Sequence, residues 1–283
     1  MVFDLPLLAT ASLSAETPAA FENSFLGWLS NSIFVTFLVV GLIVWMVRSC
    51  TRKIEVIPSA GQNFLEAVVE GFYGAIEGIL GDKMAKKSFG LLASLFIFIL
   101  ISNWFGLIPG VGSIGWGLKD GLFTLKELEI PLLRPPTADM NMTMALAAVS
   151  MTLWFVWTMQ ATGPVAFIKD LFGVKGGMSG PILFLLVPLF LFVGVLEVLS
   201  ILVRPVSLSL RLYGNIFAGE NLLGTMINIG HLFNAPQWLT YVLSCIVPIP
   251  FYFMELLVGF LQAMVFTLLI IVYLQLSTTH EEH

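Results

Sequence analysis

The sequence predicts an all-α polytopic membrane protein, with about five transmembrane crossings and an amphipathic helix on the membrane surface. Hydrophobic residues make up 58% of the 283 residues and charged residues only 11%, whereas soluble domains have about 45–50% apolar and about 25% charged residues. The apolar residues form long unbroken runs, unlike the alternating strands of an outer-membrane barrel. The composition therefore excludes a soluble globule, a disordered chain and a disulfide scaffold.

Charge and cysteine usage narrow the function classes further. The net charge is −5, and an acidic chain is a poor partner for nucleic acid. Cys50 and Cys245 lie far apart and form no CxxC motif, so the sequence predicts neither a metal site nor a redox pair. We therefore expect no cofactor, no metal and no nucleic-acid partner, and we expect the lipid bilayer to surround the chain.

The crossings are predicted from apolar runs of about 20 residues or more, the length that a helix needs to span a bilayer core. Residues 1–28 precede the first run and are interpreted as an external N-terminal segment, and residues 29–283 as one integral membrane domain. The runs are Leu29 to Val47, Phe89 to Ile108, Met142 to Gln160, Pro181 to Gly230 and Trp238 to Leu276.

Lys and Arg residues predict the orientation. The segment before the first run has none, whereas the connection from 48 to 88 has six. By the positive-inside rule, the N-terminus is external and this connection is internal. The connection 109–140 is then external, and the connection 161–180 is internal. The six basic residues are Arg48, Arg52, Lys53, Lys83, Lys86 and Lys87.

The internal connection contains a predicted amphipathic helix at about residues 62–80. Glu66, Glu70 and Glu77 recur at i, i+4 and i+11, which places them on one helical face, while apolar residues fill the other face. Such a helix lies on the inner membrane surface or against a partner.

The last hundred residues allow two interpretations. A cut at Arg204-Pro205 gives six spans, whereas uncut runs give two helices of about 73 and 58 Å, far longer than a bilayer core of about 30 Å. Two such helices fit only if they are steeply tilted or kinked, as a long hairpin over about 181–276. The prolines that could bend them are Pro188, Pro205, Pro248 and Pro250.

The candidate functional residues are the polar side chains on these two runs, because charge inside a membrane usually marks an ion or substrate path. Glu197, Arg204 and Arg211 are spaced by seven, which places them in one stripe. Arg211 separates two sets of polar residues. The outer set is Asn103, Asp139, Asn141, Glu220 and Glu255, with Gln262 on the face of Glu255, and the inner set is Glu197, Ser200 and Ser207, with Asn215 on the stripe.

Simpler roles are open for several of these residues. Arg204 either extends towards the membrane surface or pairs with Glu197. Asp139 and Asn141 could cap the helix that begins there, and Gln262 could join two helices by hydrogen bonding. Arg211 lies too deep for extension to the surface, so we interpret it as a permanent cation that separates two half-channels.

The segment PVSLSLRLYGNIFAGEN at 205–221 closely resembles the signature of subunit a of F-type ATP synthases. Other segments agree in order and spacing, and the resemblance covers about residues 25–283, with a tail that looks bacterial. These segments are QNFLEAVVE at 62–70, SNWFGLIPG at 102–110, PTADMN at 136–141 and LQAMVFTLLIIVYL at 261–274.

The resemblance implies a fold, a set of partners and a role for each site residue. It implies five crossings with the C-terminus cytoplasmic, in a bacterial inner membrane. Arg211 is implied to meet the carboxylates of a rotating c-ring, with Asn215 beside it. Glu220, Glu255 and Gln262, with Asn103 and Asn141, are implied to line the outer half-channel, and Glu197 and Ser207 the inner one. Peripheral-stalk b subunits and the rest of the ATP synthase are the other implied partners.

Two other classes of function remain to be weighed. A proton-coupled secondary transporter would also bury charges, but it should show internal repeats, which the sequence lacks. A purely structural membrane anchor would not need Arg211, Glu220 and Glu255 together. The chain has no GxxxxGK[ST] loop, so we expect no ATP chemistry on it. The transported ion is a proton or a sodium ion, and its identity depends mainly on the c-subunit.

Overall fold

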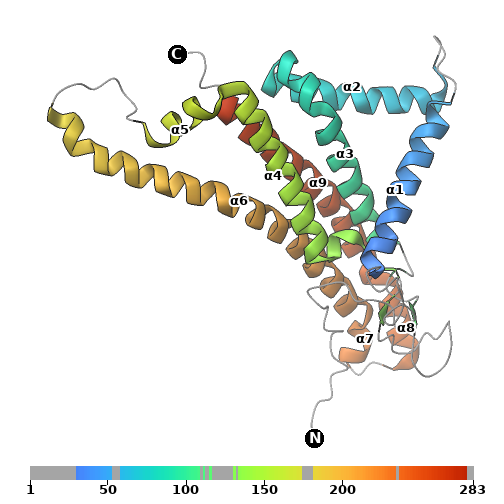
Figure 1. Cartoon of the computed structure of the whole chain (residues 1–283). Coiled ribbons are helices and arrows are strands. Elements are labelled where there is room, and N and C mark those ends of the chain that lie inside the picture. The colour runs from blue at the N-terminus through green and yellow to red at the C-terminus, as the bar shows by residue number, and fades with distance from the viewer. Residues whose placement is uncertain are drawn as a thin grey trace, which may run out of the picture.

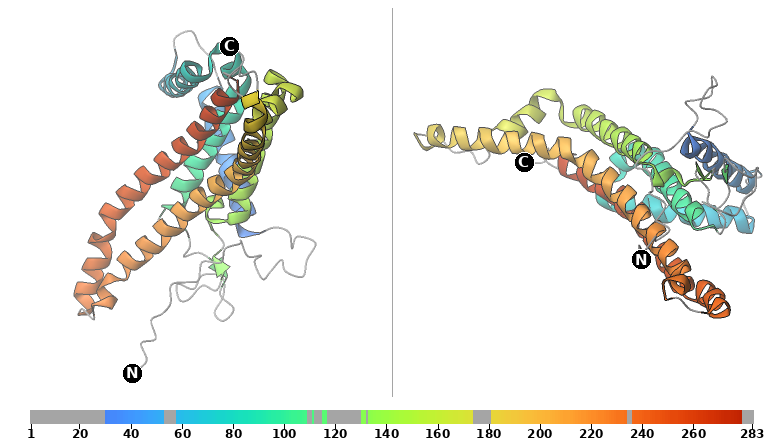
Figure 2. Two further views of the ribbon diagram at one scale, coloured as in Figure 1. Left: turned by 90° about the vertical axis from the view of Figure 1, so that its left-hand side faces the viewer. Right: turned by 90° about the horizontal axis from the view of Figure 1, so that it is seen from below.

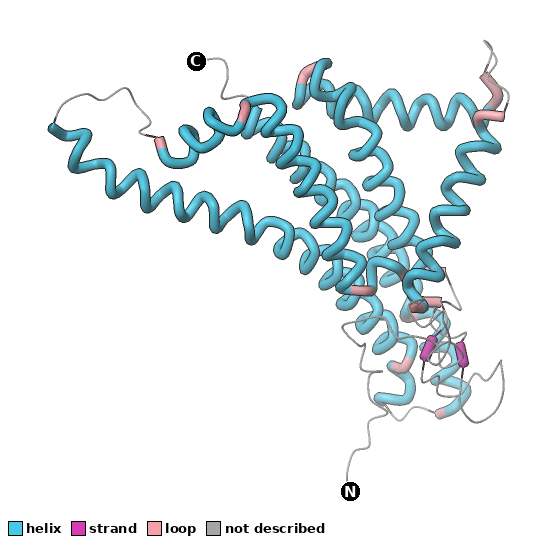
Figure 3. Tube along the Cα trace, in the orientation of Figure 1, coloured by secondary structure: helices cyan, strands magenta, loops and turns pink. Residues whose placement is uncertain are grey.

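The computed structural model describes residues 30–52, 58–108, 111, 115–116, 130–131, 133–173, 181–233 and 236–278. Within these ranges the chain is mostly helical, with short loops and turns and one antiparallel pair of two-residue strands, β1 (Gly115–Trp116) and β2 (Ile130–Pro131) (Figure 3). Five of its helices are long and apolar enough to cross a membrane. The predicted all-α polytopic fold is confirmed. The expected N-terminal segment, residues 1–28, lies outside the described residues.

The first two helices are placed as predicted. Helix α1 (Asn31–Cys50) is capped by the Ser30 hydroxyl, and α2 (Ala60–Leu80) by that of Ser59. Figure 1 shows α2 lying across the end of the bundle, at a steep angle to α1 and α3. This is the orientation expected of a surface helix. We call this end of the molecule the α2 end.

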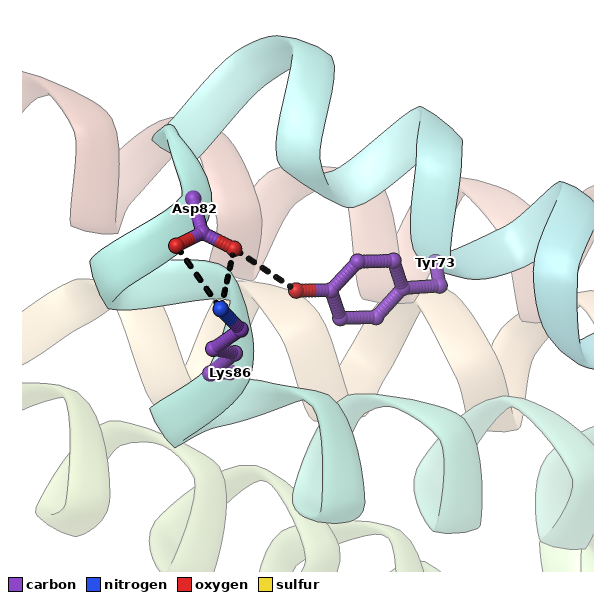
Figure 4. Close-up of polar contacts among 3 residues, drawn as sticks. All are labelled: Tyr73, Asp82 and Lys86. Atoms are coloured by element: carbon purple, nitrogen blue, oxygen red, sulfur yellow. Dashed lines mark hydrogen bonds and ion pairs between the residues drawn. The ribbon is translucent and has the colours of Figure 1, made fainter.

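A tight turn at Gly81, with a φ of 73°, joins α2 to α3 (Asp82–Gly106). Helix α3 begins seven residues before the predicted apolar run, and Asp82 and Lys86 form an ion pair of 2.8 Å in its first turn. The Tyr73 hydroxyl of α2 donates to Asp82 at 3.3 Å (Figure 4). Partial burial, together with the nearby charges of Asp82 and Glu77, raises the pKa of Tyr73.

At the opposite end, a non-helical segment is enclosed by the bundle. All six residues from Arg134 to Asp139 are buried, and the short 3-10 helix η1 (Pro136–Ala138) contacts α1, α3, α4 and α6. Pro135 packs so closely on Gly106 that a side chain at Gly106 would collide with it. Irregular backbone at membrane depth is tolerated where protein surrounds it. We call this end the η1 end.

Helix α4 (Met140–Thr162) returns to the α2 end, and Gly163, with a φ of 80°, turns the chain into α5 (Pro164–Phe172). The sequence analysis treated 161–180 only as an internal connection, so α5 is an element that it missed. Pro164 at the first helical position favours a helix start there. Helix α5 packs on α6 at Gly194, where an added Cβ would collide with the Phe172 ring and the Leu171 carbonyl.

The last hundred residues form the long hairpin, and the six-span interpretation is wrong. Helix α6 (Pro181–Ile227) runs for 47 residues without a break, with Pro188 and Pro205 inside it. Helices α7 (Ile229–Leu232) and α8 (Gln237–Ile246) make the turn, and α9 (Pro248–Thr278) returns. The break before Pro248 confirms the bend predicted there. Figure 2 shows α6 and α9 as two steeply tilted helices that meet at α7 and α8.

The packed core lies between α3, α4 and α9, with Leu208 and Leu212 contributed by α6. Large apolar side chains such as Phe37, Trp45 and Phe253 are exposed outside this core, as expected for a surface that faces lipid tails. Helix α6 diverges from the bundle towards its first residues (Figure 1), and little of its span is buried. One long face of α6 is therefore available to lipid or to a partner.

Candidate functional site

The site is built where α9 packs against α3 and against the second half of α6. Glu255 and Gln262, seven residues apart on α9, are 6% and 4% exposed. The side-chain amide of Asn215 on α6 donates to Gln262 Oε1 at 2.5 Å. The structure therefore confirms that Glu255 and Gln262 share a buried face, and it brings Asn215 to that face. The role of Gln262 as a polar link between helices is also confirmed.

Glu255 packs directly against the backbone of α6 at Gly219. An added Cβ at Gly219 would collide with the Glu255 carboxyl group, so only glycine permits this approach. The next residue, Glu220, is exposed on α6, and the charge of Glu255 acts on it. The sequence analysis placed both carboxylates in one outer set, and the structure brings them together.

Asn103 joins α3 to the same face of α9. Its Nδ2 donates to the Gly259 carbonyl at 3.1 Å, one turn from Gln262, and the side chain is 3% exposed. Asn103 Oδ1 and Gln262 Nε2 are both buried without a hydrogen-bond partner among the described residues. A buried acceptor and a buried donor thus lie within about two helical turns of Glu255 along α9.

Asp139 has a structural role at the start of α4, where Asn141 contributes its backbone N–H. Asp139 caps the helix by accepting from the Asn141 backbone N–H at 3.0 Å, and its other oxygen accepts from the Ser32 hydroxyl of α1 at 2.7 Å. The predicted capping role of Asp139 is confirmed. The side chain of Asn141 is exposed, and no hydrogen bond within the described ranges connects either side chain to Glu220 or Glu255.

Arg211 lies on α6 one turn before Asn215, and its side chain is exposed, whereas Leu208 and Leu212 are buried on the packed face. The one ion pair within the described ranges joins Lys86 and Asp82, so Arg211 has no carboxylate partner there. Arginine stays protonated at any relevant pH. The arrangement presents a permanent cation on a face that this chain leaves open.

Both roles expected for Arg204, extension to the membrane surface and pairing with Glu197, are wrong. Neither expected role describes it, because no ion pair with Glu197 forms and the guanidinium turns towards the bundle. Its Cζ lies 4.5 Å from the ring centroid of Tyr273 on α9 and 5.6 Å from that of Trp154 on α4. Cation–π attraction replaces a carboxylate partner, and the half-buried side chain belongs to the packed interior.

The side chains of the inner set are not enclosed by other parts of this chain. Ser200 and Ser207 are exposed and Glu197 is half-buried, and the described residues provide no hydrogen bond to these three side chains. All three precede Leu208, the first residue of α6 that belongs to the buried core. The structure does not bring this set together into an enclosed path.

Arg134 was missed by sequence reasoning, which predicted only that the connection 109–140 is external. Its side chain is 9% exposed and donates from Nη2 to the Ala138 carbonyl at 3.1 Å, and its charge acts on Glu220. The signal in the sequence was the position of Arg134, directly before Pro135-Pro136. Those two prolines follow Arg134 in the buried segment. No group of three or more His, Cys, Asp or Glu side chains within the described ranges could hold a metal ion.

Comparison with known proteins places these features in context. The sequence model of the family described as "ATP synthase A chain" matches residues 32–275. The chain is 34% identical to ATP synthase subunit a of Trichlorobacter lovleyi, over 90% of this chain and 89% of the relative. It is 32% identical to that of Geobacter sulfurreducens, over 90% of both chains. It is also 34% identical to that of Protochlamydia amoebophila, over 91% of this chain and 83% of the relative.

Proposed function

The chain belongs to the family of ATP synthase subunit a, and from this premise we propose that it provides two offset half-channels for protons, separated by Arg211. One observation carries the proposal. Arg211 is an exposed cation without a partner among the described residues, and it stands between the enclosed polar set near Glu255 and the open polar set near Ser207. The secondary-transporter alternative is not favoured by the relatives.

The outer half-channel runs from the η1 end to Arg211. A proton enters at Glu220 and Glu255, whose carboxylates can take it up and release it. Asn103, Gln262 and Asn215 support this path because they offer buried donors and acceptors along α9. Asn141 is exposed near the entrance, and Asp139 holds the adjoining helices in place. The proton then neutralises a carboxylate on a partner, for which the family implies the c-ring.

Neutralisation explains how that carboxylate can leave the chain. A neutral acid tolerates contact with lipid, whereas an ionised one in the membrane costs several kcal/mol. The site therefore moves away protonated and returns to the inner half-channel at Glu197, Ser200 and Ser207. There it loses its proton and pairs with Arg211. A proton that crosses yields about 2.3 kcal/mol per 100 mV, which the rotation conserves for ATP synthesis.

The proposed function also implies a location, an orientation and further partners for the chain. Residues 29–283 act as one membrane domain without ATP chemistry of their own, and catalysis takes place elsewhere in the ATP synthase complex. The protein lies in the bacterial inner membrane with its η1 end outside, so the N-terminus is external and the C-terminus cytoplasmic. The peripheral-stalk b subunits hold it against the rotation.

Orientation is tested by cysteine labelling in right-side-out and inverted vesicles. The background replaces Cys50 and Cys245 by serine, and single cysteines are introduced at Lys83, near the α2 end, and at Gln237, which begins α8; both side chains are exposed. We expect an impermeant maleimide to label Gln237→Cys from outside and Lys83→Cys from inside. The reverse pattern would reject the orientation.

The half-channel proposal is tested with Arg211→Ala and Arg211→Lys in membrane vesicles that contain the whole complex. We expect both complexes to assemble and both to lose ATP synthesis and ATP-driven pumping. Arg211→Ala should also conduct protons passively, because protonated ring sites could pass between the half-channels. Arg211→Lys should fail at coupling because lysine lacks the planar fork and loses its proton more easily when desolvated. An assembled Arg211→Ala complex that makes ATP at the normal rate would falsify the role of Arg211.

A further inference from the structure

Two arginines occupy equivalent positions on α6, one heptad apart, yet they have different surroundings. Seven residues turn a helix to within about 20° of the same direction and advance it by about 10 Å. Arg204 and Arg211 therefore start from the same stripe. Arg211 is exposed, whereas Arg204 is half-buried and directed at two aromatic rings. Helix geometry alone therefore does not explain why Arg211 is exposed and Arg204 is half-buried.

The separating feature is a pair of rings contributed by two other helices. Tyr273 of α9 lies 4.5 Å from the Arg204 Cζ, and Trp154 of α4 lies 5.6 Å from it. Trp154 is 2% exposed and is part of the packed core, and Tyr273 packs against that core. The rings are thus fixed, and their faces attract a guanidinium most strongly where water is excluded.

A second free arginine would interfere with the proposed mechanism. Guanidinium groups bind carboxylates tightly through paired hydrogen bonds, whichever arginine supplies them. If Arg204 could reach the open face of α6, it would offer an emptied ring carboxylate a second partner beside Ser207 and Ser200. The carboxylate would then be held on the inner path instead of at Arg211.

We propose that Trp154 and Tyr273 hold the Arg204 guanidinium against the bundle, so that Arg211 alone is available to the carboxylates of the rotating partner. Tyr273 is the main positioning residue, because its ring centroid lies closer to the Arg204 Cζ than that of Trp154 does. This inference rests on the proposed function of Arg211.

The test compares variants that keep or remove the ring face at position 273. Tyr273→Leu keeps an apolar side chain but removes the face, and Tyr273→Phe keeps the face. Per assembled complex, we expect Tyr273→Leu to lower ATP-driven pumping by about threefold to thirtyfold, the range that follows from the loss of one cation–π contact. Tyr273→Phe should pump at the normal rate, as should Arg204→Gln.

The decisive variant combines Tyr273→Leu with Arg204→Gln. If Tyr273 acts by holding Arg204, removal of the arginine should restore pumping to the rate of Arg204→Gln alone. If Tyr273 only fills space, the double variant should pump as poorly as Tyr273→Leu. The second result, or a normal rate in Tyr273→Leu itself, would overturn the inference. If Tyr273→Leu reduces assembly too far for a rate, Trp154→Leu with Trp154→Phe as its control gives the same comparison.

Arg211→Ala, measured in the same vesicles, separates this inference from the function on which it rests. A normal rate in Arg211→Ala would reject the half-channel function. Loss of coupling in Arg211→Ala, with normal pumping in Tyr273→Leu, would reject only the role of the rings.

Discussion

Towards the η1 end, α6 meets polar partners within the same chain, whereas the two serines Ser200 and Ser207, nearer its first residues, face outwards. Asn215 binds Gln262, and Gly219 receives the Glu255 carboxyl group. Ser200 and Ser207 are exposed, without a hydrogen bond from the described residues. In the proposed function, the outer half-channel is therefore built within one chain, but the inner one needs a second surface to close it.

This difference predicts how each half tolerates change. A buried polar group that loses its partner pays the full cost of desolvation, whereas an exposed one is still free to bind water. Substitutions in the enclosed half should therefore affect proton flux strongly and specifically. Substitutions in the open half should act weakly unless they alter contact with the partner.

The largest effect is expected when the carboxylates of the enclosed half are removed. Glu220→Gln and Glu255→Gln keep the size of the side chain but cannot carry a proton. Each should slow proton flux by about tenfold to a hundredfold, as loss of a proton-transfer group typically does. Flux is measured as ATP-driven acidification of vesicles, with complex abundance determined in parallel.

Glu70→Gln, on the exposed face of α2, is the matched control and should pump normally. If Glu220→Gln and Glu255→Gln both pumped at the normal rate in fully assembled complexes, neither carboxylate would belong to the proton path.

The next effect concerns the close approach of α9 to α6. Gly219→Ala places a methyl group where the Glu255 carboxyl lies, so the carboxyl must shift from its position against α6. We expect proton flux to fall by about tenfold, equivalent to a barrier higher by about 1.4 kcal/mol. Gly224→Ala is the control, since an added Cβ there meets nothing within 4 Å. Equal proton flux in the two variants would show that proton transport does not depend on the packing of Glu255 against Gly219.

A smaller effect should follow from breaking the link between Asn215 and Gln262. Gln262→Leu leaves the Asn215 amide without its acceptor, which should destabilise the subunit by about 1–3 kcal/mol. Replacing both residues by leucine should restore part of that stability, because two apolar side chains leave no polar group unpaired. Thermal unfolding of the purified complex measures the difference. A double variant less stable than either single variant would contradict this account.

The smallest effects are expected in the open half. Ser200→Ala and Ser207→Ala remove hydroxyl groups that have no partner on this chain, and each should change proton flux by less than about twofold, within the usual range for surface substitutions. The measurement is the same vesicle assay. If either serine variant lost as much proton flux as Gly219→Ala, proton transport would depend on the inner set as strongly as on the outer one.

The comparison also separates what the sequence could predict from what it could not. Hydropathy and proline positions predicted the five spans, the surface helix and the bend before Pro248, because these depend on residues close together in the chain. Helix α5 was missed because nine residues are too few for a spanning signal. The stacking of Arg204 on Trp154 and Tyr273 depends on residues 50 or more positions away. Heptad spacing predicts the helix face on which a side chain lies, but it does not predict which residues of other helices pack against that face.

The same limit applies to the site. The presence of Glu220, Glu255 and Arg211 on the two long helices was predictable, since charge in an apolar run is visible in the sequence. The need for glycine at position 219 and the burial of Arg134 were not, since both depend on how separate helices pack.

The contact of α5 with α6 at Gly194 has a mechanical consequence. A helix that stands away from its bundle and bears a rotating neighbour behaves as a beam under side load, and its deflection grows steeply with unsupported length. Helix α6 is about 70 Å long, and it is braced by the core at Leu208 and Leu212 and again by α5 at Gly194. The second support shortens the free span, so α6 should bend less under a side load from the proposed rotating partner.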